Sequence, residues 1–257
     1  MRSTPGNWPA SIWLVRHGES AGNVARDHAE DHGLPMIDIA LRDMDVPLSS
    51  RGEHQARALG AWLAGEPASR RPTCTLSSPY VRAQTTARLV LETSGCDARQ
   101  IDIEVDERLR EREFGILDRL TRPGIEARHP EQAAARAFLG KFYHRPPGGE
   151  SWADVALRLR SVLDSIGRQY AGERLLVVTH QVVILVFRYL LERLSEAQLL
   201  AIDREADIAN CAITVFEYDA TAGRHGGMSL RRWNDASAVL AAGEPVTTEP
   251  DARVAPR

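Results

Sequence analysis

The sequence has 257 residues, which suits one large α/β domain or two small ones, and its 43% hydrophobic and 26% charged residues are typical of a globular protein. A formal net charge of −3 argues against a basic nucleic-acid-binding surface, and no stretch reaches the roughly 20 apolar residues of a membrane span. We therefore expect no nucleic-acid or membrane partner. Three scattered cysteines are too few for a disulfide framework, which favours a cytoplasmic protein.

In the N-terminal half, apolar runs rich in β-branched residues alternate with segments of helical period. This pattern indicates a parallel or mixed sheet covered by helices. Pro79 has a backbone preset for a first helical turn and is expected to open a helix. In chain order the expected elements are a strand over 11–15, a helix over 49–64, a strand over 73–77, a helix over 79–93 and a strand over 101–105.

In the C-terminal half, apolar residues from Trp152 to Tyr170 recur at helical spacing, which predicts a helix that covers a core. The apolar run 174–179 predicts a buried central strand. A helical segment over 121–143 interrupts the alternation and is interpreted as an insertion. The remaining expected elements are helices from 182 and 195 and a closing antiparallel pair over 211–218 and 229–233.

These elements predict one main domain over residues 11–234. A segment at about 112–150 is inserted into this domain. Residues 1–10 form an N-terminal extension, and the Ala-, Pro- and Thr-rich tail over 235–257 is predicted to be disordered.

Two histidines directly follow predicted strands: His17 after the first strand and His180 after the buried strand. In open α/β sheets, ligands bind beyond the carboxyl ends of the strands, so these positions have first weight. Arg16 precedes His17, and Arg82 falls in a first helical turn, where a guanidinium and helix N–H groups together suit an anion. The alternative is an ordinary strand-end histidine or a solvated helix arginine. Together the four residues predict a phosphate site that contains a nucleophile.

Six short motifs contain these residues or lie between them. They are Leu14-Val15-Arg16-His17-Gly18-Glu19-Ser20 with Asn23, Pro47-Leu48-Ser49-x-x-Gly52, Ser77-Ser78-Pro79-x-x-Arg82-Ala83, Leu109-x-Glu111-x-x-x-Gly115, Gly149-Glu150-Ser151 and Val177-Val178-Thr179-His180. In content and order they resemble the motifs of the histidine phosphatase superfamily, branch 1, the phosphoglycerate-mutase-like proteins. The resemblance covers about residues 11–220. It implies a three-layer α/β sandwich: a mainly parallel central sheet flanked by helices, with a helical insertion over the active site.

The resemblance implies that His17 is the nucleophile and carries a phosphohistidine intermediate. Cations at Arg16 and Arg82 favour a neutral, nucleophilic imidazole, because they disfavour a third positive charge. Arg16, Arg82 and His180 would neutralise the oxygens of the transferring phosphoryl group. The further expected phosphate ligands are Gly18, Ser20, Asn23 and Gln181.

A leaving alkoxide needs a proton, and one charged loop offers three carboxylates: Glu107, Glu111 and Glu113. The residues alone permit any of the three. The family spacing, Leu109-x-Glu111 followed by Gly115, implies that Glu111 is the acid. The same carboxylate would then take a proton from the incoming water.

The segment after Asn23 favours a phosphatase over a mutase. In the mutases this Asn is soon followed by a Gly-Trp pair, whereas here a longer acidic segment without tryptophan follows it. Residues 116–121 and Gln181 look closer to the fructose bisphosphatase branch. The resemblance implies that the segment inserted at about 112–150 selects the substrate. The candidates for binding the rest of the substrate are therefore Arg112, Tyr143 and Arg145.

We therefore expect hydrolysis of a small phosphorylated metabolite, with a sugar phosphate among the candidates. One alternative is a phosphoglycerate-type mutase, which must keep water from its phosphohistidine. The other is a catalytically silent scaffold that binds a phosphorylated ligand or a protein.

Other motifs are weaker. Asp43-Met44-Asp45 imitates the Asp-x-Asp of aspartyl phosphatases but follows no buried strand. The spacing from Cys74 to Arg82 is too long for the Cys-x5-Arg of cysteine phosphatases. His28 and His32 lie four residues apart, as in some metal sites, yet a solvated acidic helix or loop explains them better. The implied chemistry needs no metal or other cofactor.

Overall fold

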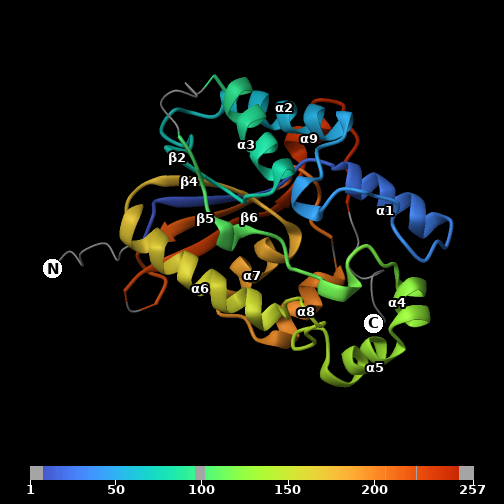
Figure 1. Cartoon of the computed structure of the whole chain (residues 1–257). Coiled ribbons are helices and arrows are strands. Elements are labelled where there is room, and N and C mark those ends of the chain that lie inside the picture. The colour runs from blue at the N-terminus through green and yellow to red at the C-terminus, as the bar shows by residue number, and fades with distance from the viewer. Residues whose placement is uncertain (1–7, 96–101, 206, 224, 249–257) are drawn as a thin grey trace.

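A computed structural model describes residues 8–95, 102–205, 207–223 and 225–248 of the chain. These residues build a six-stranded sheet in the order β3-β2-β4-β1-β5-β6 (Figure 1). The first four strands in this order run parallel, and β5 and β6 extend the sheet through antiparallel pairs, which confirms the predicted mainly parallel sheet. The strands are β1 (Ser11–Arg16), β2 (Cys74–Ser77), β3 (Ile103–Val105), β4 (Arg174–Thr179), β5 (Ile213–Asp219) and β6 (Gly227–Asp235).

The central strand β1 contributes to two hydrophobic cores, one on each face of the sheet. Successive side chains of a strand point to opposite faces. Ile12 and Leu14 therefore enter one core, while Trp13 and Val15 enter the other. Burial on both faces explains why the four residues from Ile12 to Val15 are all apolar rather than alternating with polar residues.

Helices cover both faces of the sheet and complete the three-layer sandwich (Figure 1). α6, α7 and α8 pack on the core that contains Ile12, and α2, α3 and α9 pack on the core that contains Trp13. The helices are α1 (Ala21–Asp31), α2 (Ser50–Gly65), α3 (Val81–Thr93), α4 (Arg122–Arg128), α5 (Pro130–Leu139), α6 (Trp152–Gln169), α7 (Gln181–Leu191), α8 (Glu196–Glu205) and α9 (Ser237–Ala241), with short 3-10 turns η1 (Asp43–Asp45), η2 (Glu107–Leu109) and η3 (Gly115–Leu117).

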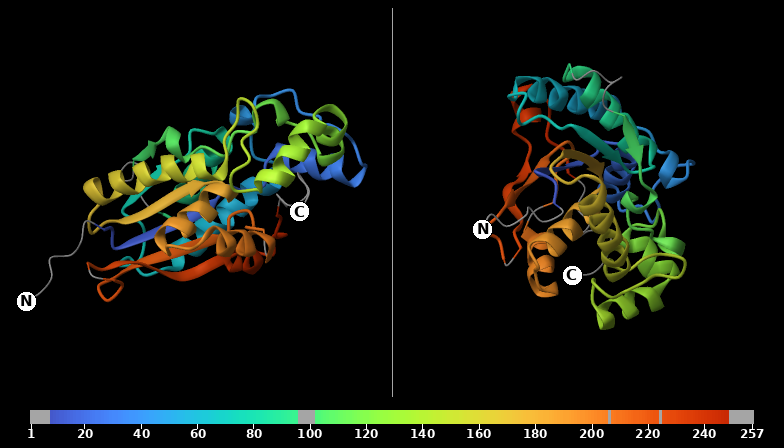
Figure 2. Two further views of the ribbon diagram at one scale, coloured as in Figure 1. Left: turned by 90° about the horizontal axis from the view of Figure 1, so that it is seen from below. Right: turned by 90° about the vertical axis from the view of Figure 1, so that its left-hand side faces the viewer.

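The inserted segment forms two helices, α4 and α5, where the sequence predicts one helix over 121–143. The break falls at Pro130, because proline lacks the N–H that a helix interior needs and disfavours helical backbone in the residue before it. Both helices lie beyond the end of the sheet, on the side of the molecule where α1 also projects (Figures 1 and 2). An isolated bridge between Met36 and Leu120 joins the insertion to the segment after α1.

The predicted disorder of the tail over 235–257 is wrong as far as residue 248. α9 follows β6, and its Val239 is fully buried against the core. Farther on, the carbonyl oxygen of Pro245 accepts a hydrogen bond from Nε2 of Gln55 in α2 (2.9 Å). The Ala- and Pro-rich composition suggests disorder, yet burial of Ala238 and Val239 in the core is enough to hold this short helix on the domain. Residues 249–257 lie outside the described residues.

The end of the predicted N-terminal extension is tied to the turn before β4. The carbonyl oxygen of Trp8 accepts from the N–H of Gly172 (3.0 Å), and the N–H of Ala10 donates to Glu173 (2.7 Å). Residues 1–7 of the extension lie outside the described residues. In the part of the chain that the structure describes, none of the helices is long and apolar enough to cross a membrane.

Candidate active site

Two histidines meet where the parallel strands end. β1 and β4 pair in register up to Arg16 and Thr179, so His17 and His180 follow their strands at the same level. Their ring centroids lie 5.0 Å apart in an edge-to-face arrangement, and the residues are 3% and 0% exposed. The sheet thus brings together the two histidines that the sequence places at strand ends.

Hydrogen bonds fix the position of the proton on the His17 ring. Nδ1 lies 2.7 Å from the carbonyl oxygen of Gly18, which can only accept, so Nδ1 carries the hydrogen. Nε2 therefore keeps its lone pair and accepts from Nε of Arg82 (3.2 Å). The backbone below the ring is anchored as well, since Nδ2 of Asn210 donates to the carbonyl oxygen of His17 (2.9 Å). Nε2 is the nitrogen that can attack an electrophile.

Arg82 is the second residue of α3 and lies in its first turn, as predicted. The helix begins at Val81 rather than at the predicted Pro79, because Tyr80 adopts extended backbone (φ −73°, ψ 135°). The guanidinium of Arg82 lies over the Tyr80 ring, 4.8 Å from its centroid. This stacking fixes the side chain beside the histidines.

Arg16 ends β1 and is 1% exposed, and its Nη1 donates to the carbonyl oxygen of Ile208. Burial lowers the pKa of His17 well below its ordinary value, and the charges of Arg82 and Arg16 lower it further. The hydrogen bond to Gly18 opposes this shift without reversing it. The imidazole of His17 is therefore neutral at pH 7.

His180 is buried beside Ser78 and Tyr80. Its Nε2 lies 2.7 Å from Oγ of Ser78, and its ring meets the Tyr80 ring edge to face at 5.0 Å. Burial, followed by the charge of Arg82, holds the pKa of His180 well below its ordinary value. Its buried Nδ1 has no hydrogen-bond partner among the described residues. That nitrogen is available to a bound group.

The predicted ligands Gly18, Ser20 and Asn23 lie around the start of α1. Ser20 and Asn23 form a capping box: Oγ of Ser20 accepts from the N–H of Asn23 (3.1 Å), and Oδ1 of Asn23 accepts from the N–H of Ser20 (2.8 Å). The N–H of Gly18 donates to Oγ1 of Thr86 (3.0 Å). These bonds give the three residues a role in shaping the turn. Gln181 begins α7, and its buried Oε1 has no partner in the described part of the chain.

Close backbone contacts between two glycines explain the second motif. A Cβ on Gly18 would lie 2.4 Å from the carbonyl oxygen of Gly52, and one on Gly52 would lie 1.9 Å from that of Glu19. Only glycine permits this approach. The buried carboxylate of Glu19 accepts from Oγ of Ser49 (2.6 Å) and Nη1 of Arg51 (2.9 Å). The start of α2 therefore supports the loop that carries the nucleophile.

Glu111 lies in the loop between η2 and η3, where its Oε1 accepts from the N–H of Arg112 (2.8 Å). Burial raises the pKa of Glu111 to about 7. That hydrogen bond and the nearby charges of Arg82, Arg158 and Arg16 limit the rise. A carboxyl group with this pKa can both give and take a proton at neutral pH.

The other two glutamates of this loop are placed differently. Oε1 of Glu113 accepts from the hydroxyl of Tyr80 (3.0 Å), so this carboxylate approaches the site but is tied to the phenol. Glu107 lies in η2, and its carbonyl oxygen accepts from the N–H of Arg110 (3.3 Å). Glu111 combines a raised pKa with a position close enough to feel the charges of Arg82 and Arg16.

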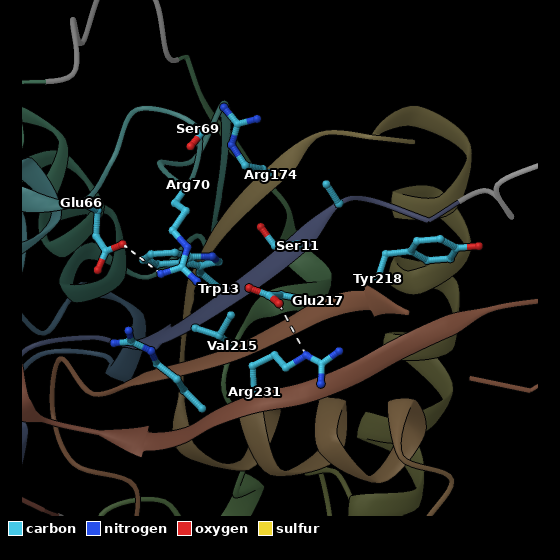
Figure 3. Close-up of a pocket in the computed structure, with 12 residues that line it drawn as sticks. Ser11, Trp13, Glu66, Ser69, Arg70, Arg174, Val215, Glu217, Tyr218 and Arg231 are labelled. Carbon is cyan, nitrogen blue, oxygen red and sulfur yellow. Dashed lines mark ion pairs between the residues drawn. The ribbon is translucent and has the colours of Figure 1, made fainter. Parts of the chain in front are cut away.

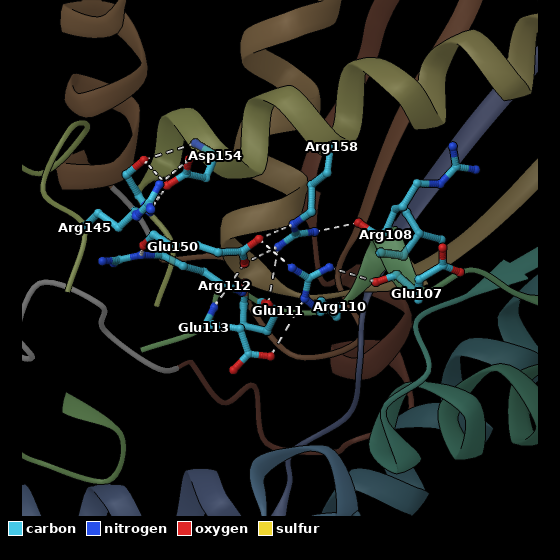
Figure 4. A network of polar contacts seen from close by, with 12 residues as sticks. Glu107, Arg108, Arg110, Glu111, Arg112, Glu113, Arg145, Glu150, Asp154 and Arg158 are labelled. Atoms are coloured by element: carbon cyan, nitrogen blue, oxygen red, sulfur yellow. Dashed lines mark hydrogen bonds and ion pairs between the residues drawn. The ribbon is translucent and has the colours of Figure 1, made fainter. Parts of the chain in front are cut away.

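A polar network centred on Glu150 holds this loop (Figure 4). The carboxylate pairs with Nε of Arg158 (2.9 Å) and Nη2 of Arg110 (2.7 Å) and accepts from the N–H of Glu113 (3.2 Å). Nη2 of Arg158 also donates to the carbonyl oxygen of Glu111 (3.3 Å). Arg158 lies in the amphipathic helix α6, yet its side chain is only 10% exposed.

The three predicted substrate contacts, Arg112, Tyr143 and Arg145, have partners within the protein. Arg112 is buried, and its guanidinium lies over the ring of Phe114 at 4.9 Å. The hydroxyl of Tyr143 is hydrogen-bonded to Glu196 in α8, and the exposed Arg145 pairs with a carboxylate of α6 (3.4 Å). The hydrogen bonds and ion pairs recorded for Tyr143 and Arg145 are thus with helices rather than with the histidines, and their binding role stays a prediction.

Sequence reasoning missed Asp43, which it set aside as a chance resemblance to another phosphatase class. In the structure its Oδ1 lies 2.9 Å from Nη1 of Arg82. Both residues line a small cavity of about 70 Å³, together with Ser20 and Asn23. No pattern in the sequence signals this contact, because it depends on the path of an exposed loop.

A larger cavity of about 440 Å³ lies at the opposite end of the sheet, where β1 begins at Ser11 (Figure 3). Two of its arginines face carboxylates of the same cavity: Nη1 of Arg70 lies 3.9 Å from Glu66, and Nε of Arg231 lies 3.5 Å from Glu217. None of its lining residues is a histidine or a cysteine. This cavity therefore lacks a nucleophile of either kind.

Within the described ranges, no three His, Cys, Asp or Glu side chains are grouped to hold a metal ion. His28 and His32 stack with ring centroids 4.3 Å apart, and Nδ1 of His32 lies 2.8 Å from the carbonyl oxygen of His28. These contacts are internal to α1 and its end.

Comparison with known families supports the motif resemblance. The model of the histidine phosphatase superfamily (branch 1) matches residues 12–236. This range covers most of the chain and contains both His17 and His180. The chain therefore belongs to the histidine phosphatase superfamily.

Similar proteins include both mutases and phosphatases. The 2,3-bisphosphoglycerate-dependent phosphoglycerate mutase 2 of Gloeobacter violaceus is 32% identical over 213 residues, which cover 82% of this chain and 87% of the relative. A structure of mycobacterial glucosyl-3-phosphoglycerate phosphatase with inorganic phosphate has a TM-score of 0.66 at 25% identity, covering 88% of this chain and 98% of the other. For Bacillus stearothermophilus YhfR the TM-score is 0.68 at 25% identity, with 89% and 98% covered.

Proposed function

We propose that the protein hydrolyses a small phosphorylated metabolite through a phosphohistidine intermediate on His17. The observation that carries this proposal is the state of the ring. Its Nδ1 is held by the carbonyl of Gly18, and its Nε2 lone pair lies beside Arg82. A neutral nucleophile next to buried cations suits attack on an anionic phosphoryl group.

In the first step, Nε2 of His17 attacks phosphorus, and an N–P bond forms as the bond to the leaving oxygen breaks. Arg16 and Arg82 stabilise the charge on the phosphoryl oxygens. Glu111 gives its proton to the leaving oxygen. Its pKa of about 7 leaves a substantial protonated fraction at neutral pH.

In the second step, water attacks phosphorus and the N–P bond breaks. The carboxylate of Glu111 takes a proton from this water, which restores the acid for the next cycle. Inorganic phosphate leaves, and His17 returns to its neutral form. The free Nδ1 of buried His180 offers a further contact to a phosphoryl oxygen through both steps.

A phosphoglycerate-type mutase is the second candidate, because named mutases are among the relatives with 32% identity over most of the chain. A mutase must shield its phosphohistidine from water, whereas a phosphatase must admit water. The acidic segment after Asn23, which lacks the Gly-Trp pair of mutases, favours the phosphatase. The similarity to a mycobacterial phosphatase over 98% of that chain agrees with this choice.

The rest of the substrate would lie toward the insertion, which meets the segment after α1 at this end of the sheet. Arg112, Tyr143 and Arg145 remain our candidates for contacts with it. A sugar phosphate is one expected substrate. The setting we infer is the cytoplasm, since Cys74 and Cys211 are free thiols.

The test is a panel of phosphorylated sugars, phosphoglycerates and p-nitrophenyl phosphate, assayed for phosphate release and for isomer exchange. Release of inorganic phosphate that His17→Ala abolishes supports the phosphatase. Isomer exchange without release supports the mutase. Binding without either reaction would overturn both and support a silent scaffold.

A further inference from the structure

The carboxylate of Asp43 forms an ion pair with the guanidinium of Arg82. Nη1 lies 2.9 Å from Oδ1 and Nη2 lies 3.2 Å from Oδ2, so the two planar groups face each other. Nη1 also donates to the main-chain carbonyl oxygen of Asp43 (2.5 Å). This fork is the arrangement that an arginine makes with two oxygens of a phosphate.

In this arrangement most N–H groups of the Arg82 guanidinium already have a partner. A guanidinium has five N–H donors. Two of them form hydrogen bonds with Asp43, one from Nη1 to the main-chain oxygen and one from Nη2 to Oδ2, and the Nε hydrogen points to Nε2 of His17. Nη1 is also engaged in the ion pair with Oδ1 (2.9 Å), which leaves one hydrogen of Nη2 for a phosphoryl group at His17. The carboxylate would also repel that group, because both carry negative charge.

We propose that Asp43 is a displaceable internal ligand of Arg82. Its carboxylate holds the guanidinium in the free enzyme, leaves when the phosphoryl group of the substrate arrives, and returns when inorganic phosphate departs. The inference rests on the proposed function, since it assigns the phosphoryl group to Arg82. Affinity falls with the fraction of enzyme in which the carboxylate is in place, so Asp43 weakens the binding of both substrate and product.

The surroundings of the pair indicate which partner moves. The side chain of Asp43 is 44% exposed, whereas that of Arg82 is 6% exposed and stacks on Tyr80. Asp43 opens the three-residue turn η1, and its neighbours Leu41 and Met44 are also exposed. The buried guanidinium therefore stays in place, and the exposed carboxylate gives way to the anion.

The closest alternative is that Asp43 positions Arg82 for catalysis and remains bound throughout the reaction. The two roles predict opposite signs for the same substitution. Removing a competitor strengthens phosphate binding, whereas removing a positioning group weakens it and lowers kcat.

The experiment compares Asp43→Asn with the matched control Asp45→Asn in the full-length protein. Asp45 lies in the same turn but pairs with the exposed Arg42 (2.6 Å). Titration calorimetry with inorganic phosphate gives Kd without any turnover, and p-nitrophenyl phosphate gives KM and kcat. We expect Asp43→Asn to lower both Kd and KM by about three- to tenfold, because a half-exposed ion pair is worth about 1 kcal/mol. Asp45→Asn should leave both constants within about twofold of wild type.

An unchanged or raised phosphate Kd in Asp43→Asn overturns the inference, as does an equal shift in Asp45→Asn. A fall in kcat with a raised KM assigns the positioning role instead. Failure of the proposed function looks different: the wild type would release no phosphate from any substrate. The effect of Asp43→Asn on phosphate Kd would still decide the inference about Arg82.

Discussion

Arginines gather at both ends of the sheet, and their surroundings differ. At the carboxyl end, Arg16 and Arg82 are 1% and 5% exposed and lie beside two histidines whose pKa values burial holds low. At the opposite end, the side chains of Arg70 and Arg231 are 60% and 48% exposed and lie near carboxylates (Figure 3).

The difference shows that charge alone does not make an anion site. An exposed arginine near a glutamate is solvated and already balanced, and such a pair contributes at most about 1 kcal/mol. Water screens the charge of a buried guanidinium only weakly, so Arg82 beside a neutral imidazole attracts an anion strongly, whether the Asp43 carboxylate or a phosphoryl group. The cavity of about 440 Å³ is therefore the weaker candidate, although it is larger than the one of about 70 Å³ beside Arg82.

The largest expected effect comes from removing the nucleophile. His17→Ala should lower kcat by about 10⁴-fold or more, because the covalent route is lost. The control is His54→Ala, which removes an exposed histidine that lies 3.7 Å from Glu244. Steady-state phosphate release measures both variants. Activity of His17→Ala within tenfold of wild type would refute the mechanism.

The next effect compares the two ends of the sheet directly. Arg82→Ala should lower kcat/KM by about 10²- to 10³-fold, as expected when a buried donor to the transferring group is lost. Arg231→Ala at the opposite end should change it by less than about twofold. Equal losses of kcat/KM in the two variants, measured with the same substrate, would contradict the proposed difference between the two ends of the sheet.

The third effect depends on the leaving group. Glu111→Gln should lower kcat/KM for an alkyl phosphate by about 10²-fold, and by much less for p-nitrophenyl phosphate, whose phenolate leaves without a proton. Glu107→Gln on the same loop is the control and should behave as wild type. A loss in Glu111→Gln that is equal for both substrates would argue against the acid role.

The smallest effect is the dependence on pH. Glu111 must be protonated to act as the acid, and its pKa is about 7, so kcat/KM for an alkyl phosphate should fall about tenfold per pH unit above 7. Burial and the charges of Arg82 and Arg16 lower the pKa of His17, which therefore stays neutral well below pH 6.5 and imposes no limit near neutrality. Glu111→Gln should lack the fall above pH 7. A wild-type profile that is flat from pH 6 to 9 would contradict this assignment.

Local sequence signals foretold much of the fold. The alternation of apolar runs and helical segments predicts the sheet and its covering helices. In the structure, Ser49 and Ser151 cap α2 and α6 by accepting from the N–H groups of Gly52 and Asp154. Proline positions predict the helix starts less accurately. Pro79 precedes α3 by two residues, since the backbone preference of one proline does not fix where the hydrogen-bonded helix starts.

Candidate site residues could be predicted where they directly follow a strand, stand in a first helical turn or, like Glu111, fall in a family motif. The apolar runs of the sequence mark where the strands end, and this placed His17 and His180 after strands and Arg82 in a first helical turn. Asp43 and Arg158 could not be found in this way. The contact of Asp43 depends on the path of an exposed loop, and the burial of Arg158 depends on Glu150, which pairs with it across the fold.

The most direct test of the central claim is to locate the covalent phosphate. The protein is mixed with a phosphorylated substrate, quenched within milliseconds at alkaline pH, where phosphohistidine survives, and analysed by peptide mass spectrometry. We predict phosphate on His17, with loss of the label in acid and none in His17→Ala. Phosphate release by the wild type with no label at His17, or with label at another residue, would contradict the account.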